Sequence, residues 1–70
     1  MEPTTYIIWM IGENPAPVAC AAADVESAVR HTVAEWRKHG LAMETVDVGA
    51  VEMSGTALHT FTIVNGHGPN

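Results

Sequence analysis

Cysteine and basic residues are both scarce in this 70-residue sequence. A single cysteine, Cys20, excludes an internal disulfide, whereas a small secreted domain normally carries several bridges. The three basic residues, Arg30, Arg37 and Lys38, stand against eight acidic ones, so the formal net charge is −5. We therefore expect most of the surface to repel phosphate backbones, which argues against nucleic acid as a direct ligand.

Long hydrophobic runs are also missing. The longest apolar stretch, Ile7 to Ile11, is far shorter than the roughly 20 residues of a membrane-spanning helix. Glu2 and Pro3 stand where a secretory leader would be basic, and the apolar stretch that follows is too short for such a leader. Together with the lone cysteine, these features predict a cytoplasmic protein, of the producing or the host cell, without a membrane partner.

The composition is that of a globular protein with few surface charges. Hydrophobic residues make up 47% of the chain and charged residues 16%. We expect a single domain over residues 1–70, in which residues 65–70 form a frayed tail rich in glycine. A domain of this size buries only about 60% of its unfolded surface, so a partner or a second copy would add stability.

The first third of the chain predicts one strand and an ambiguous segment. Thr4 to Ile11 is dense in β-branched and aromatic residues and ends at Gly12, which predicts a strand. Pro17 to Ala22 is either a short strand or a loop, because its alanines have weak strand propensity. Both faces of the first strand are apolar, since Tyr6, Ile8 and Met10 alternate with Ile7, Trp9 and Ile11.

A helix is predicted from about Val25 to His39. Asp24 is typical of an N-cap, basic residues crowd the last turn, and Gly40 suits a left-handed C-cap. Five apolar residues recur at helical spacing and form one stripe. They are Val25, Ala28, Val29, Val33 and Trp36.

The last third of the chain predicts an antiparallel hairpin. Met43 to Met53 and Thr56 to Val64 read as strands joined by a tight turn at Ser54 and Gly55. The apolar residues change parity at Gly49, and a bulge there would keep them all on the core side. These residues are Val46 and Val48 before the glycine and Val51 and Met53 after it. In the final strand, Leu58, Thr60, Thr62 and Val64 share one face, and His59, Phe61 and Ile63 share the other.

Together these elements predict an α+β fold. It consists of a three- or four-stranded, mainly antiparallel sheet with one helix packed on one face. Because a single helix covers only one face, the opposite face must meet solvent, a second copy or a partner. We expect that face to carry one of the two apolar sets of the first strand.

No group of residues has the spacing of a catalytic or metal site. His31 and His39 lie about 12 Å apart along a helix, too far for one ion, although Glu35 lies between them. Cys20 is flanked by alanines, which favours an inert buried thiol, and no serine belongs to a nucleophile motif. We therefore predict a protein that is not an enzyme and has no metal or other cofactor.

We interpret the chain as a non-catalytic protein-interaction domain. It would inhibit or modulate a larger protein, one with a basic surface that handles nucleic acid, by covering part of that surface. The candidate contacts are apolar anchors of the first strand and an acidic rim, namely Tyr6, Ile8, Met10, Glu13, Glu44, Asp47 and Glu52. Two alternatives stay open: a homodimer that binds a small ligand between its copies, and an enzyme whose site is completed across a dimer.

In length, acidity, single cysteine and strand–helix–hairpin order, the chain resembles small phage-encoded inhibitors, including anti-CRISPR proteins. Those inhibitors occupy nucleic-acid-binding or subunit surfaces of bacterial defence complexes. The resemblance is one of type, and it transfers no residue role to this chain. It implies a stoichiometric inhibitor with a protein target.

Overall fold

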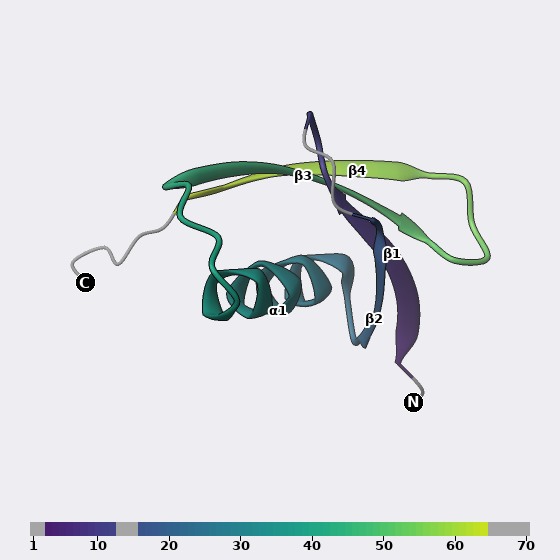
Figure 1. Ribbon diagram of the computed structural model, residues 1–70. Helices are drawn as coiled ribbons and strands as arrows, with labels where there is room; N and C mark the ends of the chain where they lie inside the picture. The colour runs from purple at the N-terminus through teal and green to yellow at the C-terminus, as the bar shows by residue number, and fades with distance from the viewer. Residues whose placement is uncertain (1–2, 13–15, 65–70) are drawn as a thin grey trace.

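The computed structural model describes residues 3–12 and 16–64, so the predicted tail at 65–70 lies outside it. The elements, in chain order, are β1 (Thr4–Met10), β2 (Val18–Ala22), α1 (Val25–Lys38), β3 (Thr45–Glu52) and β4 (Leu58–Val64). The four strands form one antiparallel sheet in the order β2-β1-β3-β4. Figure 1 shows α1 lying along one side of this sheet. The predicted α+β fold is confirmed, and the ambiguous segment before the helix is an edge strand.

The helix begins at Val25, as the sequence predicts, and ends at Lys38, one residue before the predicted end at His39. Asp24 is the N-cap in extended conformation, and its Oδ1 accepts a hydrogen bond of 2.8 Å from the backbone N–H of Ser27. After the last turn Gly40 adopts a φ of +112°, a region that residues with a Cβ rarely enter. The stripe faces the sheet: Val29 and Val33 are buried, and Val25 and Trp36 are partly buried against the core. These contacts confirm the predicted orientation of α1.

The core lies between α1 and one face of the sheet. From the strands it takes Tyr6, Ile8, Met10, Val46, Val48 and Ala50, and from the helix Ala28, Val29 and Val33. The largest side chains among them that are fully buried are Ile8, Val29, Val46 and Val48. Full burial of such a side chain contributes roughly 1.5–3 kcal/mol, so this thin layer accounts for much of the hydrophobic stabilisation.

The bulge predicted at Gly49 is wrong. Pairing of β3 with β1 runs without interruption from Tyr6↔Glu52 to Met10↔Val48, and pairing with β4 is equally regular. Because the alternation is kept, Val51 points away from the core, on the side where Trp9 covers Gly49. Gly49 allows the indole of Trp9 to pack closely against β3, and the pairing register does not change at this residue.

The hairpin connection also differs from the predicted two-residue turn. β4 begins at Leu58, which pairs with Val51, so Thr56 and Ala57 belong to the connection. The N–H of Gly55 donates to the carbonyl of Glu52 at 2.8 Å and closes the first part of this loop. In the part of the chain that the structure describes, no helix has the length and hydrophobicity to cross a membrane.

Candidate functional site

Within residues 3–12 and 16–64, no helix or strand covers the side of the sheet turned away from α1; we call this side the open face. Residues that pair directly across antiparallel strands share a face, so the register defines its membership. From the edge at β2 to the edge at β4, its strand residues are Ala19, Ala21, Thr5, Ile7, Trp9, Thr45, Asp47, Gly49, Val51, Leu58, Thr60, Thr62 and Val64. Apolar and threonine side chains dominate this surface.

The first-strand anchors predicted for a partner lie on the wrong side. Tyr6, Ile8 and Met10 are only 9%, 0% and 7% exposed, because they point toward α1 and form the centre of the core. Buried side chains cannot contact a partner in the folded protein, so their assignment as contact residues is corrected. The alternative set, Ile7, Trp9 and Ile11, lies on the side away from the helix.

The open face carries solvent-exposed apolar side chains at both of its ends. Ile11 is 44% exposed, Leu58 61% and Val64 60%. Between them, Trp9 and Val51 are half-buried by their neighbours in the sheet. Large apolar surface that a monomer leaves in water, with an aromatic residue among it, is typical of a protein-binding surface.

Among the described strand residues of the open face, Asp47 is the one that carries a carboxylate. It lines a shallow hollow of about 260 Å³ together with Ile11, Thr60, Phe61 and Thr62. The hydroxyl of Thr62 donates to Asp47 Oδ1 at 2.8 Å, which holds the carboxylate against the cross-strand neighbour. The hollow therefore combines a fixed negative charge with apolar and hydroxyl-bearing walls, a setting suited to a cationic side chain.

The other predicted acidic residues do not form a rim around this face. Glu44 precedes β3, and its carbonyl accepts a hydrogen bond from the Arg37 guanidinium at the end of α1. Glu52 pairs with Tyr6 and so belongs to the helix side of the sheet. Glu13 lies outside the described residues. Of the rim predicted from sequence, the structure places Asp47 alone on the open face.

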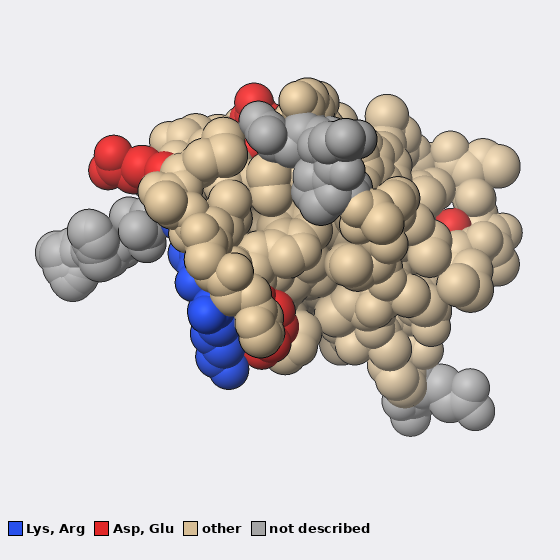
Figure 2. Space-filling view, viewed as in Figure 1, with Lys and Arg blue, Asp and Glu red and all other residues tan. Residues whose placement is uncertain are grey.

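Charge is nevertheless divided unequally along the chain. All three basic residues lie in α1, and the segment from Asp24 to Lys38 holds three acidic and three basic residues, hence zero net charge. The remaining five acidic residues give the whole formal charge of −5. On the face drawn in Figure 2, Lys and Arg atoms gather at one place, and most of the visible surface is uncharged.

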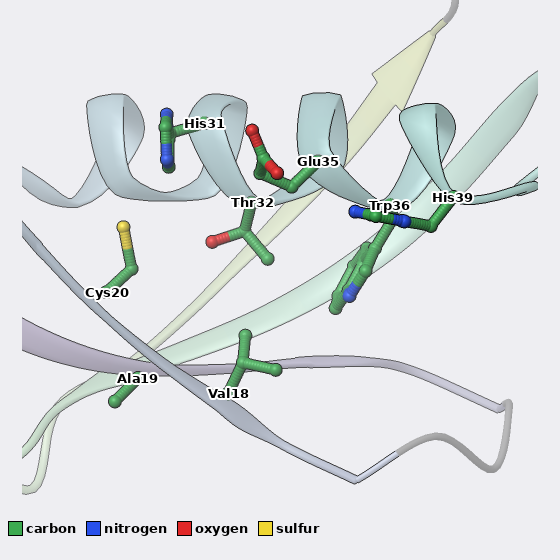
Figure 3. A pocket seen from close by; sticks show the side chains of 8 residues that line it. All are labelled: Val18, Ala19, Cys20, His31, Thr32, Glu35, Trp36 and His39. Atoms are coloured by element: carbon green, nitrogen blue, oxygen red, sulfur yellow. The ribbon is translucent and has the colours of Figure 1, made fainter.

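A second candidate region is a groove of about 280 Å³ between α1 and β2. Its walls are Val18, Ala19 and Cys20 from the strand and His31, Thr32, Glu35, Trp36 and His39 from the helix. Figure 3 shows Cys20 and Val18 pointing from β2 toward the helix, with Trp36 reaching back from α1. The groove was not predicted from the sequence. The residue pattern of α1 does not indicate that an edge strand lies beside the side of the helix that carries His31 and His39.

The chemistry of the groove is that of an open, largely apolar recess with imidazole and carboxylate groups on one wall. Its volume lies just below the roughly 300–1,000 Å³ of ordinary small-molecule pockets. Within residues 3–12 and 16–64, no three or more His, Cys, Asp or Glu side chains are grouped so that they could hold a metal ion. That the protein binds no metal stays a prediction.

No protein-family model, curated protein or solved structure matches the chain. A functional assignment therefore has to come from the geometry of the open face and the groove.

Proposed function

We propose that this protein is a non-catalytic binding protein that inhibits or modulates a larger protein by covering part of its surface with the open face. One observation carries the proposal: a single helix covers one side of a four-stranded sheet, and the other side presents exposed Ile11 and Leu58 around half-buried Trp9. Apolar anchors at the centre of an interface supply most of its binding energy.

The charge distribution indicates the kind of partner. The formal charge of −5 comes entirely from residues outside the neutral segment that contains α1. A partner with a positive surface, such as one that holds nucleic acid, would be attracted to a chain of this net charge. Asp47 and its hollow would then receive a lysine or arginine side chain of that partner.

This function agrees with the type of protein that the sequence resembles, a small acidic inhibitor of the anti-CRISPR kind that acts stoichiometrically. It also explains why a domain this small would leave so much apolar surface in water. The groove beside α1 is the weaker candidate, because its volume lies below that of ordinary small-molecule pockets and because, among the described residues, no three His, Cys, Asp or Glu side chains are grouped so that they could hold a metal ion.

The test compares substitutions on the two candidate regions. Ile11→Ser and Asp47→Asn alter the open face, whereas His31→Ala alters the groove, and all three positions are exposed. Immobilised protein of each type would be used to capture partners from the native host, with bound proteins quantified by mass spectrometry. Circular dichroism establishes that each variant is folded.

We expect one protein with a positive surface to be captured stoichiometrically by the native chain and by His31→Ala. Ile11→Ser should weaken its binding about tenfold or more, and Asp47→Asn should reduce both the association rate and its dependence on salt. Binding that is unchanged in both open-face variants, or lost in His31→Ala alone, would contradict the proposal.

A further inference from the structure

We propose that β4 is a self-pairing edge, through which two copies of this chain join antiparallel and edge to edge, centred on Phe61, into one eight-stranded sheet. The proposal does not rest on the open-face partner, because its main contacts are the backbone groups at the edge of the sheet, although pairing would also cover Leu58 and Val64 at the margin of the open face. It follows from three properties of β4: its position, its composition and its sequence symmetry.

β4 is at the end of the sheet order β2-β1-β3-β4 and pairs with β3 alone among the described strands. An edge strand presents a row of unpaired N–H and C=O groups, which is a template for another strand. Natural edges are usually protected by charged residues, proline, bulges or short length. β4 has seven residues, contains no proline, Asp, Glu, Lys or Arg, and pairs with β3 without a bulge.

The other edge of the sheet is less suited to pairing. β2 has five residues and begins just after Pro17, which has no N–H to donate. It also forms one wall of the groove beside α1. The protected edge and the unprotected edge are therefore on opposite ends of the sheet, and β4 is the one that favours a second copy.

In the sequence of β4, Leu-His-Thr-Phe-Thr-Ile-Val, the two threonines and the two aliphatic ends are placed symmetrically about Phe61, and His59 with Ile63 is the one unlike pair. In an antiparallel pair with a two-fold axis at Phe61, that residue meets its own copy. Thr60 then lies opposite Thr62, and Leu58 lies opposite Val64. Thr–Thr, aromatic–aromatic and aliphatic pairs are each favourable across antiparallel strands. An unrelated partner strand would match this pattern only by chance, whereas a second copy matches it by symmetry.

Pairing in this register would cover apolar surface that the monomer exposes. Leu58 and Val64, each about three-fifths exposed, would lie against each other on the open face. Phe61, which is half-buried at the margin of the core, would meet its symmetry mate on the helix side. Two chains of charge −5 can approach here because β4 itself carries no charged residue.

The decisive comparison uses two double variants that differ only in the charge at residue 60. In the proposed register, Thr60→Lys with Thr62→Lys places lysine opposite lysine at both cross-chain pairs. Thr60→Glu with Thr62→Lys places glutamate opposite lysine at the same pairs. Both variants place a lysine at residue 62, across from Asp47 in the same chain. Residue 60 is exposed and pairs with Gly49, which has no side chain. The two double substitutions should therefore affect the folding of a single chain to a similar extent.

Sedimentation equilibrium measures the outcome, with circular dichroism as the check of fold. We expect the native chain and the Glu/Lys variant to be dimers of about 15 kDa, twice the chain mass of 7.5 kDa. The Lys/Lys variant should be a monomer, with a dimer dissociation constant at least about 100-fold higher, because like charges opposite each other destabilise a strand pair. A monomeric native chain, or a dimer that the Lys/Lys variant retains, would overturn the proposal.

A cross-linking experiment tests the register without relying on charge. In a Cys20→Ser background, chains with Thr60→Cys and Thr62→Cys would be mixed and oxidised. Directly opposite residues in antiparallel strands have Cα atoms about 4.5–5.5 Å apart, which suits a disulfide. The yield of disulfide-linked dimer should be several-fold higher in the mixture than in either variant alone. Equal yields in all three samples would contradict pairing centred on Phe61.

Discussion

The indole of Trp9 lies over Gly49, its cross-strand partner on the open face. A Cβ placed on residue 49 would be 2.5 Å from Trp9 Cζ2, well inside the 3.0 Å that real Cβ atoms respect. Trp9 thus shields the backbone of β3 on a side that α1 does not cover, and glycine leaves the space that the ring occupies.

Gly49→Ala should therefore displace the Trp9 ring and destabilise the protein. Alanine normally improves a strand position held by glycine, because glycine loses more conformational entropy on folding. Here we expect the free energy of unfolding to fall by about 1–3 kcal/mol, the usual cost of overpacking. Urea denaturation measures the loss, and tryptophan fluorescence in a Trp36→Phe background should shift to longer wavelength as the indole becomes more solvated.

The control is the same substitution in a Trp9→Leu background. Without the indole, Gly49→Ala should become neutral or stabilising, so the two residues should show a coupling of about 1 kcal/mol or more. If Gly49→Ala costs the same in both backgrounds, the close contact of Trp9 with Gly49 is not its cause.

Neighbouring isoleucines on β1 provide a matched test of which face the helix covers. Ile8 is fully buried under α1, whereas Ile7 is half-buried on the open face. Ile8→Ala should lower the free energy of unfolding by roughly 2–5 kcal/mol, enough to unfold much of a domain this small. Ile7→Ala should cost clearly less. Equal losses, measured by thermal or urea denaturation, would mean that both faces are covered.

Trp36 is predicted to matter less than a fully buried tryptophan. Its side chain is half-buried, because one side packs on the core and the other lines the groove. Trp36→Ala should therefore cost less than the roughly 3–5 kcal/mol of a buried Trp→Ala substitution. Trp36→Leu, which keeps an apolar group on the core side, should restore part of that loss. A loss as large as that of Ile8→Ala would contradict partial burial.

The N-cap of α1 predicts a specific pH dependence. The hydrogen bond from the backbone N–H of Ser27 stabilises the ionised carboxylate and lowers the pKa of Asp24 below its ordinary value of 3.8. Because the pKa of Asp24 is lower in the folded state, its ionised carboxylate contributes fully to stability above pH 3.8. This contribution is lost as the pH falls through the folded-state pKa. The melting temperature of Asp24→Ala should be lower than that of the native chain at neutral pH, and the difference should shrink below about pH 4.

Asp24→Asn is the matched control, because its amide oxygen can still cap the helix without a charge. The melting temperature of Asp24→Asn should stay near that of the native chain. The difference in melting temperature between Asp24→Asn and Asp24→Ala should not change with pH through protonation of residue 24, because neither variant has a carboxyl group there. A constant difference between the native chain and Asp24→Ala from pH 7 to pH 2.5 would contradict the assigned role of the carboxylate.

Local patterns predicted the elements because each depends on residues close in sequence. The N-cap at Asp24, the stripe through Val29 and Val33 and the glycine after the last turn determine α1 from nearest neighbours alone. The alternation in β4 likewise separates Thr60 and Thr62 from Phe61 without any knowledge of the rest of the fold. These features appear in the structure where the sequence places them.

Long-range pairing decided the remainder, and the candidate site depends on it. Tyr6, Ile8 and Met10 are as apolar as Ile7, Trp9 and Ile11, so no local rule says which set meets the helix. The bulge at Gly49 was predicted from parity within one strand, whereas the glycine accommodates Trp9 of another strand. The sequence by itself determined the helix, the strands β1, β3 and β4, and the surplus of apolar surface, but it left β2 open between a strand and a loop. Only tertiary structure, through strand register and the placement of one helix, decided which apolar set is buried and which side of the sheet is left open.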